Sequence, residues 1–120
     1  MKELSHEAAA RLSQIDYDRE MALVGFDPVG AAVGVARFAA DPEGETAEFA
    51  LMVRTDQQNR GIGRTLLARL VEVAHGRGLR TLWGEVMSTN REMLIMADAF
   101  GFVRSESGDP EMVRVTLDFE

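Results

Sequence analysis

The chain has 120 residues, of which 46% are hydrophobic and none is cysteine. This length suits one domain and is short for two, so we expect a single domain over residues 1–120. The lack of cysteine excludes a disulfide scaffold, a cysteine-ligated zinc site and a cysteine nucleophile. No apolar run approaches the roughly 20 residues of a membrane-spanning helix, and the N-terminus has no signal-peptide pattern, so a cytoplasmic location is expected.

The net charge of −7 comes from 13 basic and 20 acidic residues, and it argues against nucleic-acid binding. The charge is unevenly distributed along the chain. Residues 1–50 carry 4 basic and 10 acidic groups, residues 51–80 carry 6 and 2, and residues 81–120 carry 3 and 8. A positive segment inside an acidic chain can mark a binding site for an anion.

The first part of the chain predicts a helix and then three strands. Ser5 can cap an alanine-rich helix that ends near Gln14. Short apolar runs bounded by turn signals follow, and they indicate strands. We expect these strands to form an antiparallel meander over Met21–Phe26, Gly30–Ala39 and Thr46–Val53.

After Gly61 the apolar residues recur at helical spacing, which predicts an amphipathic helix that stops at His75–Gly78. A fourth strand is expected within Leu79–Met87. A second helix is then expected around Met93–Phe100; its methionines Met93 and Met96 are interpreted as core residues, with an acyl tunnel as the alternative. The last strands are expected at Phe102–Val103 and Met112–Phe119.

The strongest site signal lies where the third strand runs through a glycine-rich turn into a helix. The first turn of a helix leaves backbone N–H groups unpaired and carries a partial positive charge. Gly61 and Gly63 let a phosphate approach those groups closely, and Arg60 and Arg64 add charge. The turn therefore favours a phosphate or pyrophosphate ligand, while a tight turn with solvated arginines is the alternative. It is neither a P-loop nor a dinucleotide-binding fingerprint.

The segment Gln58–Gly63 resembles the Q/R-x-x-G-x-G/A signature of the GNAT superfamily, the Gcn5-related N-acetyltransferases. Downstream, Asn90–Leu94 with Gly101–Phe102 resembles the second cofactor segment of that family. Two matching segments in the correct order are specific. The resemblance implies an α+β (mixed α/β) GNAT fold with a central, mostly antiparallel, twisted sheet and helices on both faces. It also implies acetyl-CoA (coenzyme A) as cofactor and an acyltransferase activity.

Within that superfamily, Gln14–Val24 and Ala47–Ala50 are similar to the acetyltransferase domain of bacterial Pat-type protein lysine acetyltransferases. This similarity implies lysine side chains of proteins as acceptors. The acidic run Asp16–Glu20 is interpreted as a binding segment for a basic protein, with a solvated loop as the alternative. Two other functions stay open: acetylation of small amines, and a catalytically silent acyl-CoA-binding module that regulates a partner.

The resemblance also assigns cofactor contacts to particular positions. The backbone of Leu51, Met52 and Val53 would pair with the pantetheine arm, and Asn90 would hydrogen-bond it. The acetyl thioester would lie where the third and fourth strands separate. The pyrophosphate would be held by the glycine turn and the helix start, at Gln58, Asn59, Arg60, Gly61, Ile62, Gly63, Arg64 and Thr65. No metal is expected.

Glu48 is the candidate base, because it sits inside an apolar strand. An attacking amine must lose a proton, and a positioned carboxylate can accept it. Burial in that strand would raise the pKa of Glu48 towards neutrality, and a glutamate on this strand is the base in Pat-like relatives. Pairing with Arg37 or Arg19, or an exposed sheet face, is the alternative, and Glu85 is the second candidate. Without cysteine, direct attack in a ternary complex is expected.

Two departures from the family pattern affect these expectations. Many GNAT members have a tyrosine about seven residues after the asparagine, where this chain has Ala97, so the proton donor stays unassigned. The family also begins with a strand that we do not find before Met21. A missing first strand would expose a sheet edge, so a homodimer or a partner segment is expected to cover it.

Overall fold

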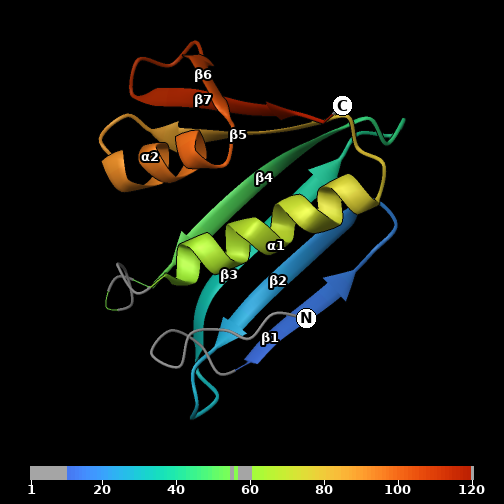
Figure 1. Cartoon of the computed structure of the whole chain (residues 1–120), viewed down its shortest axis with the longest axis vertical. Coiled ribbons are helices and arrows are strands. Elements are labelled where there is room, and N and C mark those ends of the chain that lie inside the picture. Colours follow the sequence, from blue (N-terminus) through green and yellow to red (C-terminus); the bar gives the residue numbers. More distant parts are fainter. Residues whose placement is uncertain (1–10, 55, 57–60, 120) are drawn as a thin grey trace.

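The computed structural model describes residues 11–54, 56 and 61–119. Within these residues the chain forms a seven-stranded mixed sheet and two helices (Figure 1), which confirms the expected α+β class. In chain order, the elements are β1 (Arg11–Asp16), β2 (Glu20–Phe26), β3 (Ala32–Ala40), β4 (Thr46–Val53), α1 (Ile62–Gly76), β5 (Thr81–Met87), α2 (Arg91–Ala99), β6 (Val103–Glu106) and β7 (Met112–Asp118).

The sheet has the strand order β1-β2-β3-β4-β5-β7-β6, and every neighbouring pair is antiparallel except β4 and β5. A parallel pair needs a crossover connection, and α1 supplies it. The parallel pairing covers three residue pairs, of which the last is Glu48 with Trp83. Beyond this pair, β4 and β5 diverge (Figure 1), so the sheet opens in its middle.

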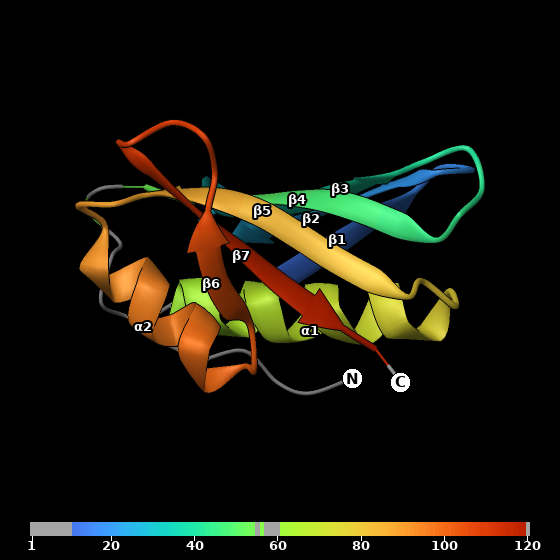
Figure 2. The same cartoon turned by 90° about the horizontal axis from the view of Figure 1, so that it is seen from above.

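Both helices of the described part of the chain lie on one face of the sheet (Figure 2), which we call the helix face. The expectation of helices on both faces is therefore wrong for these residues. Because side chains alternate along a strand, the opposite face, which we call the open face, carries every second residue of each strand. Neither described helix is long and apolar enough to cross a membrane.

The expected helix up to Gln14 is wrong over its last residues, because Arg11–Asp16 forms strand β1. Residues 5–10 of that helix lie outside the described residues. β1 pairs with β2 along its whole length, and α1 fixes it from the helix face. The Arg69 guanidinium donates to Gln14 Oε1 at 3.1 Å, and Arg77 donates to Asp16 and to the Tyr17 carbonyl. Tertiary contacts thus override the helical propensity of the segment.

The expected absence of a first strand is wrong for the same reason, since β1 occupies the edge beside β2. A homodimer or partner segment was expected because that edge seemed unoccupied. Strand β1 occupies that edge, so no homodimer or partner segment is needed to supply the first strand.

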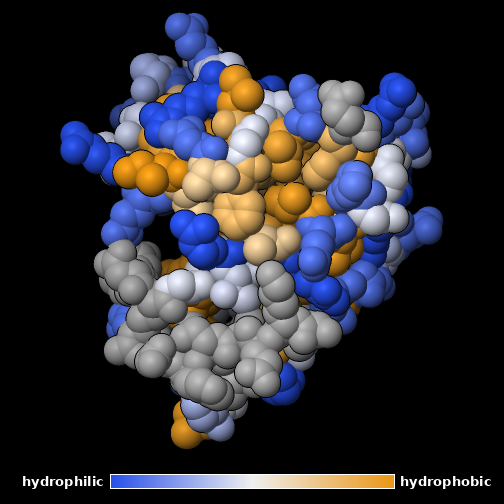
Figure 3. Space-filling view, in the orientation of Figure 1, coloured by the Kyte–Doolittle hydropathy of each residue, from blue (hydrophilic) through white to orange (hydrophobic). Residues whose placement is uncertain are grey.

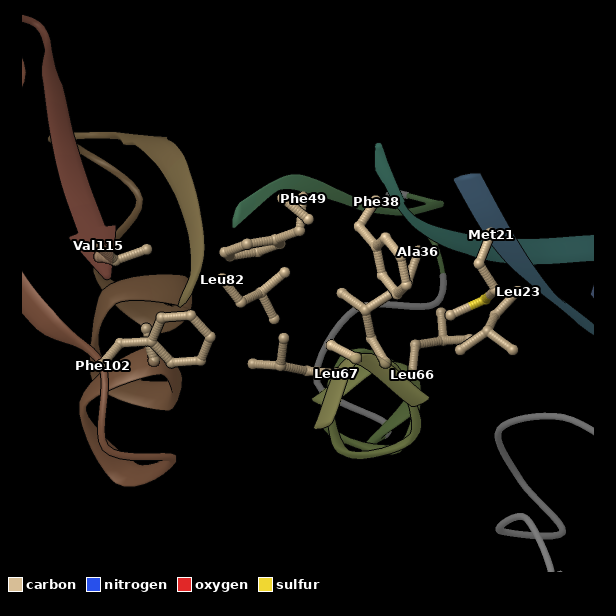
Figure 4. Packing of buried hydrophobic residues seen from close by; sticks show 14 of the residues in the cluster. Met21, Leu23, Ala36, Phe38, Phe49, Leu66, Leu67, Leu82, Phe102 and Val115 are labelled. Carbon is tan, nitrogen blue, oxygen red and sulfur yellow. The ribbon is translucent and has the colours of Figure 1, made fainter. Parts of the chain in front are cut away.

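The core lies between the sheet and α1, as the close view of Figure 4 shows for Phe38, Leu66 and Leu67. α1 approaches β3 closely at Gly34. A Cβ atom at this position would lie 2.9 Å from Leu66 Cδ1 and 3.2 Å from the Met52 carbonyl oxygen. Only glycine leaves room for the helix at this crossing.

We therefore predict that Gly34→Ala lowers the free energy of unfolding by about 1–3 kcal/mol, the usual cost of overpacking a core. Urea denaturation measures this change. Gly76→Ala is the matched control, because no atom lies within 4 Å of its would-be Cβ; it should leave stability unchanged or slightly higher. Equal effects of the two substitutions would contradict the packing argument.

Candidate functional site

A cleft of about 540 Å³ opens on the helix face where β4 and β5 have separated. β4 forms one wall, the beginning of α1 forms a second, and α2 forms the third. Figure 3 shows the helix face hollowed between α2 and the start of α1. The cleft is lined by Leu51, Val53, Gly61, Gly63, Arg64, Asn90, Glu92, Met93, Ile95 and Met96.

The start of α1 leaves its backbone donors available to the cleft. Gly61 is the N-cap residue, its φ of 81° is left-handed, and no side chain caps the helix. The first turn holds no acidic residue. The Thr65 hydroxyl does not face a ligand, because it donates to the Gly61 carbonyl at 3.0 Å. An uncapped N-terminus without an acidic residue in its own first turn suits an anion.

The two glycines of the turn have different physical roles. A Cβ at Gly61 would meet no atom within 4 Å, but the left-handed backbone disfavours any side chain there. A Cβ at Gly63 would lie 3.5 to 3.8 Å from Met96, Val53 and Leu51. Gly63 therefore brings the helix start against both walls of the cleft. Ile62, assigned to the same turn, is buried in the core.

Most of the arginines described in the positive segment, residues 51–80, bind other parts of the chain and do not line the cleft. Arg54 forms an ion pair with Asp56 at 2.8 Å, and this hydrogen bond raises the pKa of Arg54 above its usual value. Arg69 and Arg77 bind β1, as described above. Of the arginines in this segment that the structure describes, Arg64 alone lines the cleft. Gln58, Asn59 and Arg60 lie outside the described residues.

The backbone of β4 offers hydrogen-bonding groups to the opening. Asp41 N–H donates to the Thr46 carbonyl, and Arg54 N–H donates to the Val33 carbonyl, both on the β3 side. Backbone groups alternate along a strand, so the N–H and C=O of Leu51 point the other way, into the space that β5 has left. The side chain of Met52 points to the open face and is 68% exposed.

Asn90 lines the cleft and also begins α2. Its Oδ1 accepts a hydrogen bond from Met93 N–H at 3.2 Å, which is ordinary N-capping. The oxygen is thus engaged in the cap, and the amide N–H₂ of the same side chain is the group that can still donate in the cleft.

Glu48 lies at the last paired position of β4, on the open face. The expected burial is wrong: the Glu48 side chain is exposed, because its neighbours Ala47 and Phe49 take the helix-face positions. No ion pair joins Glu48 to Arg37 or Arg19 within the described ranges. The carboxylate is therefore unpaired and accessible from the face opposite the cleft.

The second candidate base is engaged. Glu85 Oε2 accepts from Arg114 at 3.1 Å, and the Arg114 guanidinium lies 4.1 Å above the centre of the Trp83 ring. The position of the missing tyrosine, Ala97, is fully buried. No side chain of the described residues is thus placed as a proton donor at that position.

Sequence reasoning matched Asn90–Leu94 to a cofactor segment but assigned a contact to Asn90 alone. Glu92, Met93, Ile95 and Met96 also line the cleft. The two methionines pack against the core as well, so the expected core role and the alternative role in the site both apply to them. Among the described residues, no cluster of three or more His, Cys, Asp or Glu side chains could hold a metal ion.

Comparisons with known proteins agree with this geometry. The family model "Acetyltransferase (GNAT) family" matches residues 2–102. An acetyltransferase of Pseudomonas aeruginosa, PA5475, is 32% identical over 112 residues, which cover 91% of this chain and 60% of that protein. The [ribosomal protein bS18]-alanine N-acetyltransferase of Escherichia coli is 33% identical over 72 residues, covering 60% and 47%. The chain thus spans about half to three fifths of these relatives.

Among solved structures, the GNAT domain of PAT from S. lividans superposes with a TM-score of 0.75 at 24% identity, covering 87% of this chain and 64% of that one. This likeness shows the shared fold. Together with the uncapped start of α1 and the divergence of β4 and β5, the family match leads to one conclusion: the chain belongs to the GNAT acetyltransferase family.

Proposed function

We propose that this protein is an acetyl-CoA-dependent N-acetyltransferase that acetylates lysine side chains of proteins. One observation carries the proposal: the opening between β4 and β5 has a cleft with an uncapped helix start on one face and the unpaired carboxylate of Glu48 on the other. A donor and an acceptor can therefore reach the same point from opposite faces of the sheet.

The residues of the cleft fit coenzyme A. The N–H groups at the start of α1, together with Arg64, would hold the pyrophosphate. The pantetheine arm would continue along β4, where Leu51 offers backbone groups as a neighbouring strand would. The Asn90 amide would bind the arm from α2. Acetyltransferases of this family use acetyl-CoA, which supplies an activated thioester when it is bound.

The chain's own groups would then support direct transfer. In direct transfer, the nitrogen of a neutral acceptor amine would form a C–N bond with the acyl carbon, and the C–S bond to coenzyme A would break with the thiolate as leaving group. The outward N–H of Leu51 would donate to the carbonyl oxygen as negative charge develops there. Glu48 would accept the proton of the amine, directly or through water.

The open face favours a cationic protein side chain as acceptor. Glu20 lies in the same cross-strand row as Glu48, with Ala39 between them. Both side chains are exposed, and two carboxylates attract a lysine ammonium before it is deprotonated. Met52 of β4 and Met87 of β5 are 68% and 57% exposed further along the same face, which suits an extended partner.

Asp16 belongs to the acidic run that was expected to bind a basic protein. Arg77 binds Asp16 on the helix face, so this carboxylate does not serve an acceptor on the open face. An α-amine, as in the alanine acetyltransferase relative, and a small amine are the alternative acceptors. The cytoplasmic location stays a prediction.

The pyrophosphate assignment predicts that Gly61→Ala weakens coenzyme A binding at least about tenfold. The methyl group and the strained φ would disturb the donors of the turn. Calorimetric titration with coenzyme A measures the affinity. Gly44→Ala is the matched control, because its φ of 71° imposes the same strain and no atom lies within 4 Å of the would-be Cβ, but the residue is in the β3–β4 turn. Retained affinity in folded Gly61→Ala would refute the assignment.

The base assignment predicts that Glu48→Gln lowers kcat by about 100-fold or more, the usual contribution of a general base. The affinity for coenzyme A should stay unchanged, because Glu48 lies on the other face. Thiol release from acetyl-CoA measures turnover with three acceptors: a lysine peptide with a blocked N-terminus, an alanine-starting peptide without lysine, and free amino acids.

Glu85→Gln is the control for this experiment, and a larger loss in that variant would move the base to Glu85. Turnover confined to the second or third acceptor would contradict the lysine proposal. Coenzyme A binding without thiol release on any acceptor would favour the silent regulatory module instead.

A further inference from the structure

We propose that the Phe49 ring limits the length of the acyl chain, so that the protein binds acetyl-CoA and propionyl-CoA and discriminates against butyryl-CoA and longer donors. This inference rests on the proposed function, since it concerns the donor that would lie in the cleft. Phe49 does not line the cleft itself; it lies two residues before Leu51, which does. Phe49 belongs to β4 and directly follows Glu48, the last residue that pairs with β5. It therefore sits where the opening ends.

The ring fills the helix-face side of this end. A Cβ atom at Gly84 of β5 would lie 2.7 Å from Phe49 Cε1 and 2.9 Å from Phe49 Cδ1, distances that real Cβ contacts essentially never show. The ring therefore reaches across from β4 to the backbone of β5, and glycine is the residue that admits it. The ring of Phe102 also packs against the ring of Phe49, and the two ring centres are 5.4 Å apart.

Figure 4 shows the Phe49 side chain descending from β4 towards Leu82 and Phe102. The Phe49 side chain is 5% exposed, so these contacts hold the ring in a packed environment. Packed aromatic rings resist displacement, because moving one forfeits many close contacts. The end of the opening is thus a fixed wall.

The direction of the donor brings its acyl group to this wall. Val53 lies against Gly63 at the start of α1, so the phosphate end of the cleft is at the C-terminal end of β4. A donor that extends from there along β4 passes Leu51. The next side chain on the same face of the strand is Phe49, two residues further back. Carbon atoms added to the acyl group beyond the thioester would meet its ring.

The test measures binding of acetyl-, propionyl- and butyryl-CoA by calorimetry without any acceptor, so no turnover is needed. In the natural protein, butyryl-CoA should bind about tenfold or more weakly than propionyl-CoA, which is one methylene group shorter, because one methylene group in an apolar pocket changes recognition about 10- to 200-fold. Phe49→Leu should reduce this difference at least about tenfold. Phe49→Met, which keeps most of the volume but has a flexible side chain, should do the same and serves if Phe49→Leu does not fold.

Phe38→Leu is the matched control. Phe38 is the cross-strand partner of Phe49, lies on the same face and is 2% exposed, but it belongs to β3 and does not border the opening. It should lose stability and keep the acyl preference of the natural protein. Acyl-CoA competition in the turnover assay gives a second readout, in which the butyryl-to-acetyl ratio of kcat/KM should rise in the Phe49 variants alone.

The inference is overturned if folded Phe49 variants keep the natural preference, or if Phe38→Leu shifts it equally. These results leave the proposed function intact, since acetyl-CoA still binds. A natural protein that binds neither coenzyme A nor any of the three donors contradicts the proposed function itself.

Discussion

The site depends on the point at which β4 and β5 stop pairing. Three parallel pairs hold the two halves of the sheet together, and the Phe49 ring then lies between the strands on the helix face. The parallel pairing ends directly before this ring, since Glu48 with Trp83 is the last pair. The divergence exposes the backbone of Leu51, makes room for the cleft beside α1, and leaves Glu48 at the junction on the opposite face. The end of this short pairing thus positions the donor side and the acceptor side together.

Local patterns in the sequence predicted most of this arrangement. Strands β2 to β4 are short apolar runs bounded by turns, and α1 has an apolar stripe at helical spacing; both patterns survive in the structure because they match the faces that are buried. The glycine turn was also predictable, since a left-handed residue such as Gly61 and an uncapped helix start are properties of a few neighbouring residues. Asn90, which caps the start of α2, was predictable for the same reason, because its cap involves only neighbouring residues.

Features that depend on distant residues were not predictable. The segment Arg11–Asp16 is strand because β2 pairs with it and because Arg69 of α1 and Arg77, the residue directly after α1, bind its side chains. No short window of sequence contains those partners. An apolar strand does not say which of its two faces a helix will cover, so burial of Glu48 was favoured and its exposure was only the alternative. For the same reason the net charge of residues 51–80 suggested a larger anion site than the structure has, because three of its described arginines, Arg54, Arg69 and Arg77, bind other groups of the chain.

The brief contact between β4 and β5 gives the bound donor a second role. Within the described residues, β1–β4 form one antiparallel set and β5–β7 another, and α1 packs mainly on the first while α2 contacts β6. A pantetheine arm between Leu51 and Asn90 would span the line along which the sheet has fewest hydrogen bonds. The donor would then add a second bridge between the two sets of strands, beside the core contacts that the Phe49 ring makes with Gly84 and Phe102. Release of the product coenzyme would remove this bridge and leave the three parallel pairs and the shared core to join them.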